Sequence, residues 1–336
     1  MMAAVDDGRD RVRDYLGRQG ERVVSLSHEL LQPPTAGRMV VEYLATLQED
    51  SPNKYKGDRR IENARPSAPG AQVSVGGCPR LAKKSVVAKF YLDERGPVAY
   101  EAMRSLHARL EQDGPLAVPE PYFYDPRLHL LAQQRVPGRP CGPLLKHHSN
   151  TSVLKQLGIA LACLHRQRGI RAEVKEMRHH VRDLIKPHPY ALAEAYPEYR
   201  PLIEATLEIL LRPAAEPFSY EASPIHRDFQ LRQLFLTERQ VWLVDWDTFA
   251  LGDPAFDVAY FLIYLKTHFD VRRYEPFRDA FLAGYFRSPP PCVLERVGVY
   301  KAFNFLRRAC RRFRIQDGSW QTELQRMMQL LESTIA

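Results

Sequence analysis

The sequence predicts an α+β protein of two lobes, a small mixed α/β lobe followed by a larger, mainly helical lobe. Strand-like patterns gather before residue 134, whereas helical periodicity dominates from about residue 150. Between them lies the stretch VPGRPCGP (136–143), whose three prolines and two glycines interrupt helices and strands alike. We therefore expect an N-terminal lobe at residues 1–137 and a C-terminal lobe at residues 138–336.

The N-terminal lobe is expected to begin with helix over residues 9–48. Val12 and Leu16 recur at helical spacing, and Met39–Leu47 adds a second short apolar stretch. The polar segment Glu49–Gly70 is typical of a loop. The elements expected next are strands at Gln72–Val75 and Ser85–Leu92, a helix at Tyr100–Glu111, and strands at Tyr122–Tyr124 and Leu128–Gln133 joined by the turn Asp125–Pro126.

The C-terminal lobe is expected to be helical on both sides of a short β stretch. Asn150 or Thr151 can cap a first helix, and further helix is expected to about Leu211. The β stretch covers residues 224–245, and helices resume from Pro254 to the end of the chain.

Composition excludes several classes of protein. Hydrophobic residues make up 45% and charged residues 26% of the 336 residues, which excludes wholesale disorder and collagen-like repeats. The longest apolar run, Val258–Leu265, has eight residues, whereas a membrane span needs about 20. The start MMAAVDDGRDR lacks the apolar core of a signal peptide, and the five cysteines form no CxxC pair. We expect a cytoplasmic protein without a membrane span, a disulfide framework or a zinc site.

The positive charge is concentrated near the C-terminus. The chain carries a net charge of +8, and residues 271–336 hold 12 Lys and Arg against 6 Asp and Glu, a net of +6. Such a region can meet nucleic acid, an anionic membrane surface or an anionic small substrate, or it can be a solvated helix face.

The chemically informative segment is His226–Asp257, which contains five aspartates. Two short strands in this segment are separated by a polar turn, so their outer ends are expected to lie side by side. Asp228 and Gln233 precede the first strand and Asp245 ends the second, which brings the three side chains to one end of the hairpin. Carboxylate and amide oxygens suit Mg²⁺, and a carboxylate left off the metal can accept a proton from an attacking hydroxyl. These are the components of phosphoryl transfer.

The motifs of this segment resemble those of a known family. HRDxxxxQ, followed by Asp245, resembles the catalytic loop and metal-binding aspartate of kinases. The continuation DWDTFALGDPAFDVAYFL resembles the aminoglycoside phosphotransferase and choline kinase family, because the DFG and APE motifs of protein kinases are absent. Upstream, VVAKFYLDERG, LAQQRVPG and LGIALACLH resemble the lysine-bearing strand, the hinge and the first large-lobe helix of that family. The resemblance covers roughly residues 70–285 and implies a bilobal protein-kinase-like fold that uses ATP and Mg²⁺.

The resemblance also implies roles for single residues in the catalytic segment. Asp228 resembles the catalytic base, Asp245 the main Mg²⁺ ligand, and Gln233 holds the place of a metal-binding asparagine. Asp253 and Asp257 resemble structural aspartates of the family.

Upstream, the resemblance implies a nucleotide site. Lys89 resembles the lysine that binds the α- and β-phosphates, and Glu101 is the expected partner that orients it. Gln134, Arg135 and Val136 would form the hinge whose backbone meets adenine.

Two features depart from the family pattern. Glutamine at position 233 places its oxygen one methylene further from the backbone than asparagine would, which affects the second metal position. No clear glycine-rich phosphate loop precedes Lys89, and the candidates are Ser67–Gly70 and Gly76–Gly77.

The leading hypothesis is therefore a small-molecule kinase that uses ATP and Mg²⁺. The basic C-terminal region repels polycations and favours a neutral or anionic acceptor, such as a sugar or sugar phosphate, over an aminoglycoside. Two alternatives stay open: a nucleotide-binding regulator without catalysis, and, less favoured, a module that binds nucleic acid or an anionic surface. The sequence sets no oligomeric state.

Overall fold

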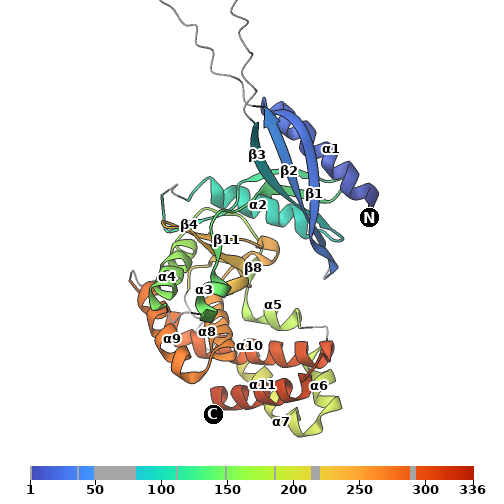
Figure 1. Cartoon of the computed structure of the whole chain (residues 1–336). Helices are drawn as coiled ribbons and strands as arrows, with labels where there is room; N and C mark the ends of the chain where they lie inside the picture. The colour runs from blue at the N-terminus through green and yellow to red at the C-terminus, as the bar shows by residue number, and fades with distance from the viewer. Residues whose placement is uncertain are drawn as a thin grey trace, which may run out of the picture. The chain divides into compact units, whose positions relative to one another are not determined.

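The computed structural model describes residues 2–35, 38–48, 81–110, 113–147, 150–184, 187–212, 220–287 and 293–336. The chain forms two compact units. The first comprises Met1–Asp93 and Tyr122–Arg135, and the second comprises Glu94–Pro121 and Val136–Ala336. A sheet dominates the first unit and helices dominate the second, which confirms the predicted α+β class (Figure 1).

The first unit is a five-stranded sheet with one helix, in the strand order β1-β2-β3-β6-β5. The pairs β1–β2, β2–β3 and β3–β6 are antiparallel. The elements are α1 (Met2–Arg18), β1 (Arg22–Thr35), β2 (Arg38–Gln48), β3 (Leu81–Tyr91), β5 (Pro121–Asp125) and β6 (Leu130–Gln134).

The expectation of helix over residues 9–48 is wrong beyond Arg18, because β1 and β2 form a long hairpin there. Burial along β2 alternates with a period of two, with Tyr43, Ala45 and Leu47 buried and the residues between them half-buried. Alternation of this kind is the signature of a strand with one face in a core, and it outweighs the helical propensity of single residues. The strand expected at Gln72–Val75 and both candidate phosphate loops lie outside the described residues.

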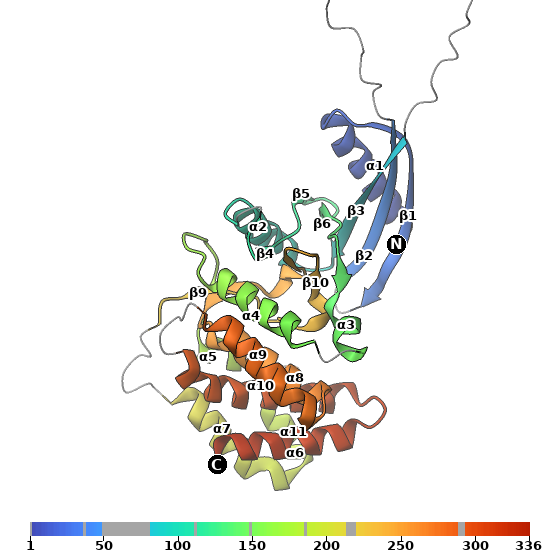
Figure 2. The same ribbon diagram turned by 60° about the vertical axis from the view of Figure 1, so that its left-hand side comes forward.

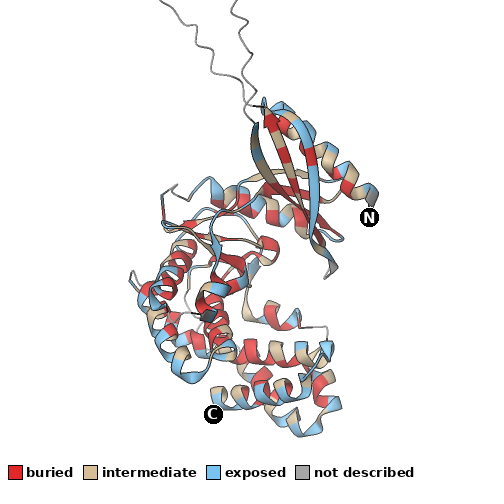
Figure 3. Cartoon of the chain, in the orientation of Figure 1, coloured by how far each residue is buried: buried red, intermediate tan, exposed pale blue. Residues whose placement is uncertain are grey.

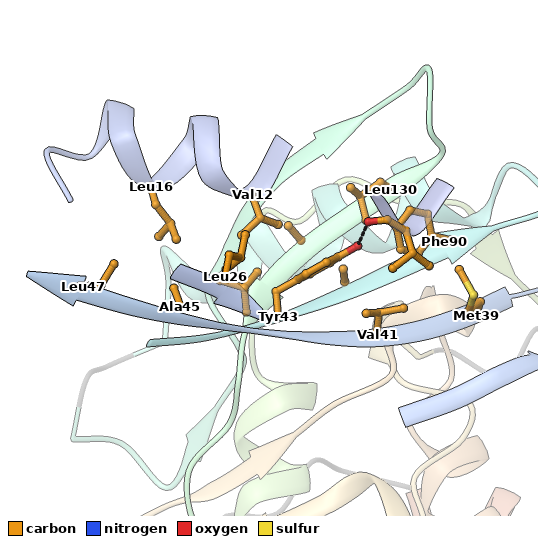
Figure 4. Packing of buried hydrophobic residues seen from close by; sticks show 14 residues of the cluster. Val12, Leu16, Leu26, Met39, Val41, Tyr43, Ala45, Leu47, Phe90 and Leu130 are labelled. Atoms are coloured by element: carbon orange, nitrogen blue, oxygen red, sulfur yellow. Dashed lines mark hydrogen bonds between the residues drawn. The ribbon is translucent and has the colours of Figure 1, made fainter. Parts of the chain in front are cut away.

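The core of the first unit lies between α1 and the sheet (Figure 4). Val12 and Leu16 of α1 are fully buried, and so is Tyr43 of β2. The Tyr43 hydroxyl donates a hydrogen bond of 2.6 Å to the carbonyl oxygen of Val5, and burial raises the pKa of this phenol. The helix is thus attached to the sheet by apolar packing and by one buried hydrogen bond.

The second unit carries short strands in two small sheets, ordered β4-β11-β10-β7 and β8-β12-β9. The strands are β4 (Leu116–Ala117), β7 (Arg139–Pro140), β8 (Val174–Lys175), β9 (Ser223–Ile225), β10 (Leu234–Leu236), β11 (Val241–Leu243) and β12 (Ala250–Gly252). The helices are α2 (Arg95–His107), α3 (Cys141–His147), α4 (Thr151–His165), α5 (Met177–Arg182), α6 (Pro189–Ala195), α7 (Arg200–Leu211), α8 (Ala255–His268), α9 (Val271–Tyr285), α10 (Val293–Ile315) and α11 (Trp320–Ile335). Single 3₁₀ turns lie at Pro197–Tyr199, Leu231–Gln233 and Trp246–Thr248.

The Pro- and Gly-rich stretch at residues 136–143 holds more regular structure than the sequence indicates. Arg139–Pro140 pairs with β10, and α3 begins at Cys141. Pro143 lies in the first turn of α3, where its missing N–H removes no intrahelical hydrogen bond. The predicted cap of α4 is confirmed, because the Asn150 side chain accepts the N–H of Ser152 at 3.1 Å.

Helix α8 is the central element of the second unit. Every residue from Ala255 to Ile263 is buried, whereas α11 buries only one face (Figure 3). Helix α10 packs against α8, and α11 packs against α10 (Figure 2). A helix that is apolar all round belongs inside a core. Among the described residues, no helix combines the length and hydropathy that crossing a membrane requires.

Helices α4 and α9 touch through two glycines. A Cβ added to Gly158 would overlap the carbonyl oxygen of Phe281, and one added to Gly284 would overlap that of Lys155. Both overlaps are with backbone atoms, which cannot rotate away as a side chain would. The close approach of α4 and α9 therefore requires glycine at both positions.

We expect Gly284→Ala to lower the free energy of unfolding by about 1–3 kcal/mol, because the added methyl group forces the two helices apart. Gly298→Ala on α10 is the matched control. Its Cβ would meet open space, so the exchange should raise stability by up to about 1 kcal/mol through helix propensity. Urea unfolding of both variants measures the difference, and equal midpoints would contradict the packing argument.

Candidate active site

The hairpin β10–β11 brings the predicted catalytic residues together. Leu234 pairs with Leu243, and the Val244 N–H donates to the Gln233 carbonyl at 3.0 Å. Gln233 directly precedes β10 and Asp245 follows β11 by two residues, so both lie at the open end of the hairpin. Asp228 lies in the loop between β9 and β10 and faces the same end.

Gln233 bridges the two aspartates. Its Nε2 donates to Asp228 Oδ2 at 3.0 Å and to Asp245 Oδ2 at 2.9 Å. The Gln233 side chain is buried, so its NH₂ group is held between the two carboxylates, gives each of them an N–H donor and offsets their mutual repulsion. The convergence expected from the hairpin pattern is therefore present in the structure.

Asp228 receives hydrogen bonds from two further residues that the sequence did not single out, and from an exposed arginine. The Tyr260 hydroxyl donates to Oδ1 at 2.6 Å, and the Gln230 amide donates to the same oxygen. Arg232 reaches Oδ2 at 3.4 Å with a side chain that is 60% exposed. Burial, and next the Asp228 carboxylate, raise the pKa of Tyr260 to about 12, so this phenol stays a donor at neutral pH.

The position of Tyr260 could have been inferred from its spacing to Asp257 in the sequence. Asp257, three residues earlier on α8, contacts the backbone of the same loop. Residues three apart share a helix face, so a polar group at position 260 points to the same neighbourhood as Asp257.

Asp257 holds the loop that carries Asp228 by its backbone. Its two carboxylate oxygens accept the N–H groups of His226 and Arg227, each at 2.7 Å. Arg227 has a positive φ of 66°, an uncommon backbone conformation for a residue other than glycine. Such strain persists where the surroundings fix the chain, and the Asp257 hydrogen bonds supply that constraint. Asp245 likewise has a φ of 73°, which aspartate tolerates better than most residues.

Two histidines complete this hydrogen-bond network. His226 donates from Nε2 to the Val244 carbonyl at 3.0 Å, and its Nδ1 accepts the Asp228 N–H at 3.3 Å. His226 thus links the loop to the hairpin and positions Asp228. His165 Nε2 lies 3.3 Å from Asp257 Oδ2, and its Nδ1 lies 2.8 Å from the Tyr285 hydroxyl.

Asp253 forms a buried ion pair at the start of α8. Its Oδ1 accepts the N–H of Ala255, the first residue of α8, at 2.9 Å. The Arg296 guanidinium binds both carboxylate oxygens, at 2.5 and 3.0 Å, and both side chains are almost completely buried. This bidentate pair attaches α10 to the loop that precedes α8.

The residues predicted to contact nucleotide lie in both units. Lys89 is buried on β3, opposite Leu131 of β6, and Gln134 ends β6. Arg135 pairs with Glu42 at 3.0 Å within the first unit, whereas Val136 begins the second stretch of the second unit.

Glu101 lies on α2 in the second unit. Its exposed side chain pairs with Arg104 one turn along the helix, at 2.8 Å. The proposed Lys89–Glu101 pair and the hinge contacts stay predictions.

The donor set at the hairpin end fits Mg²⁺ that is shared with a substrate. Asp245 and Gln233 can supply two oxygens, and Mg²⁺ usually takes one or two protein ligands and fills the rest with phosphate and water. Among the described residues no group of three His, Cys, Asp or Glu forms a metal site made by protein ligands alone. Because the Gln233 nitrogen faces both carboxylates, offering its oxygen to a cation requires the amide to turn.

Comparison with known proteins identifies the family of this chain. The model of the phosphotransferase enzyme family matches residues 79–294, well over half of the sequence. The chain belongs to the phosphotransferase enzyme family. No curated protein sequence gives a significant match to this phosphotransferase.

Solved structures confirm the predicted bilobal protein-kinase-like fold and the resemblance to aminoglycoside phosphotransferases and choline kinases. A choline/ethanolamine kinase family protein from Mesorhizobium loti aligns with a TM-score of 0.55 at 17% identity, over 77% of this chain and 86% of that chain. A macrolide 2′-phosphotransferase from Brachybacterium faecium aligns with a TM-score of 0.52 at 17% identity, over 95% of this chain and 98% of that chain. A GDP complex of an aminoglycoside 2′-phosphotransferase aligns with a TM-score of 0.56 at 14% identity, over 97% of both chains.

We expect Arg296→Met to lower the free energy of unfolding by about 3–5 kcal/mol, because it leaves the buried Asp253 carboxylate without its counter-charge. Arg278→Met is the control. Its partner Asp279 is exposed, so the loss should be at most about 1 kcal/mol. Denaturant unfolding of the two variants measures the contrast, and similar losses would show that burial does not set the strength of the Asp253 pair.

Proposed function

We propose that this phosphotransferase transfers the γ-phosphoryl group of ATP to a hydroxyl of a small molecule. The observation that carries the proposal is the Asp228–Gln233–Asp245 cluster at the end of the β10–β11 hairpin. It sets a carboxylate that can take a proton beside a carboxylate and an amide that can bind a metal ion. Family membership and the nucleotide-bound relative support the nucleotide part of the proposal.

Asp228 acts as the base. As the hydroxyl oxygen of the acceptor bonds to the γ-phosphorus, its proton passes to the Asp228 carboxylate, the bond to the β,γ-bridging oxygen breaks, and ADP leaves. The other donors fix the orientation of the carboxylate. Arg232 makes the longest of these contacts and is the most exposed of their side chains, so it is the donor that an acceptor hydroxyl can replace.

Asp245 and Gln233 would hold Mg²⁺, which neutralises charge on the transferring phosphates. Lys89, oriented by Glu101, would bind the α- and β-phosphates. Gln134, Arg135 and Val136 would hold adenine through their backbone. These roles follow from the resemblance to the family. The buried position of Lys89 on a central strand is compatible with its proposed role in phosphate binding.

The charge around Asp228 favours a neutral or anionic acceptor. Arg307 and Arg308 of α10 both lie over the ring of Tyr260, which bonds to Asp228. Guanidinium groups so close to the base repel a polycation. We therefore propose an acceptor such as a sugar or sugar phosphate. Among the similar structures, by contrast, some are complexes with kanamycin or streptomycin.

We expect ATP with Mg²⁺ to raise the melting temperature by several degrees at about 100 times its Kd, because a ligand at that concentration stabilises by about 2.7 kcal/mol. Asp245→Ala should lose the Mg²⁺-dependent part of this shift, whereas Asp228→Asn should keep it and lose phosphoryl transfer. Asp279→Ala, at an exposed aspartate on α9, is the control and should behave like the parent.

Two outcomes would contradict the proposal. The absence of any shift with ATP or GTP would remove the nucleotide site. Nucleotide binding with equal and negligible single-turnover transfer in the parent and in Asp228→Asn would favour a regulator without catalysis.

We expect Tyr260→Phe to lower kcat by about tenfold while the KM for ATP stays unchanged. The exchange removes one hydrogen bond to the base, worth about 1 kcal/mol or more, and leaves the ring in place. Tyr264→Phe, one turn further along α8, is the control and should keep the parent rate. An unchanged kcat in Tyr260→Phe would show that the tyrosine does not position Asp228.

A further inference from the structure

Two arginines of α10 are positioned next to the catalytic base by one aromatic side chain. The Cζ atoms of Arg307 and Arg308 lie 5.8 and 5.6 Å from the ring centroid of Tyr260. The hydroxyl of the same ring donates to Asp228 at 2.6 Å. Both guanidinium groups thus contact the aromatic ring whose hydroxyl binds the carboxylate that an acceptor hydroxyl must reach.

Within the described part of the chain, neither arginine has a carboxylate partner. Arg308 donates to the Thr267 hydroxyl at 3.1 Å, and Arg307 makes no hydrogen bond there. Arg296, earlier on the same helix, is buried against Asp253. Half-buried arginines are normally paired, since an uncompensated charge near a core is costly. Arg307 and Arg308 therefore hold positive charge and free N–H donors beside the active site.

A third arginine adds to this charge. Arg227 lies 5.9 Å from the ring of Phe256, which stacks with Tyr260 one turn away on α8. Its Nε is buried and has no hydrogen-bond partner among the described residues. Its ion pair with Asp183, at 3.4 Å, is shared with Lys175.

These positive charges influence one another. Burial lowers the pKa of Arg227 and of Arg308, and the charge of Arg307 lowers both further. Arg307 is therefore close enough to repel each of the other two guanidinium groups, and an anion beside it would reduce that repulsion.

We infer that Arg307 and Arg308 bind an anionic group, a phosphate monoester or a carboxylate, on the acceptor whose hydroxyl reaches Asp228; this inference rests on the proposed function. The planar fork of a guanidinium matches the paired oxygens of either group and binds it in a fixed orientation. Two such forks beside the base select acceptors by their negative charge and orient the hydroxyl toward Asp228.

Recessed arginines suit a small anion better than a nucleic-acid backbone. A polyanion would contact the exposed arginines Arg311 and Arg314 at the end of α10. The half-buried Arg312 between them already pairs with Asp317. Arg311 lies one turn beyond Arg307, is exposed and makes no ion pair within the described residues. It is therefore a matched control on the same helix.

The binding test uses inorganic phosphate and acetate as probes on the full chain with saturating ADP and Mg²⁺, so that nucleotide phosphate positions are filled. We expect phosphate to raise the melting temperature of the parent and of Arg311→Gln. Arg307→Gln should weaken the apparent phosphate affinity about ten- to hundredfold, the loss typical of one charge-assisted hydrogen-bond pair. The phosphate affinity of Arg307→Lys should lie between those of the parent and Arg307→Gln, because lysine keeps the positive charge but lacks the planar guanidinium fork. Whether phosphate or acetate gives the larger shift distinguishes a phosphate from a carboxylate ligand.

The transfer test ranks acceptors by charge, with glucose, glucose 6-phosphate and glucuronate as matched probes within a wider screen of hydroxyl compounds. For anionic acceptors, Arg307→Gln should lower kcat/KM about ten- to hundredfold. An acceptor that is neutral or cationic and loses nothing in Arg307→Gln would overturn the inference.

The outcomes also separate this inference from the proposed function. Equal phosphate affinity in the parent, Arg307→Gln and Arg311→Gln overturns the anion site, while an ATP shift that depends on Asp245 keeps the proposed function. Phosphate binding that depends on Arg307, without any nucleotide shift, overturns the proposed function and with it the acceptor role of the site.

Discussion

The segment that carries Asp228 depends on one buried carboxylate, that of Asp257. Its oxygens accept two consecutive backbone N–H groups and so hold Arg227 in a left-handed conformation that an arginine rarely adopts. Asp228 follows directly and is directed toward Gln233 and Tyr260. Because Asp257 and Tyr260 belong to the same buried helix, α8 fixes both the backbone of the loop and the side chain of Asp228. A shift of α8 would move both together.

The sequence predicted the second unit better than the first. The meeting of Asp228, Gln233 and Asp245 followed from one hairpin, because two short strands and a tight turn leave little choice of geometry. The β2 strand was mistaken for helix, since its buried residues repeat at a spacing of two beside further apolar neighbours that also fit a helical pattern. Besides the neighbouring β1, it pairs along its full length with β3, which begins only at Leu81. A pairing of that range is a tertiary preference that a local pattern does not contain.

Several energetically unfavourable features lie around Asp228. His180 is buried against Phe256, and neither of its ring nitrogens has a hydrogen-bond partner among the residues that the structure describes. Burial and nearby cations lower its pKa to about 2. Arg227 and Asp245 are strained, and positive charges crowd along the aromatic face of α8. Each of these features lowers the stability of the fold. Features of this kind are typical of functional sites, and here they are concentrated beside Asp228.

The pairing of β2 with β3 has a consequence for where this phosphotransferase can be shortened. The family match begins at residue 79, just before β3, yet the sheet continues through strands that precede it. A chain cut at that boundary loses α1, β1 and β2, and β3 becomes an edge strand with unpaired N–H and C=O groups from Leu81 to Tyr91. The apolar face that α1 covers, with Val86 and Phe90, would be open to water at the same time. Such an edge recruits other chains, so the boundary of sequence similarity is not a boundary of the folded unit.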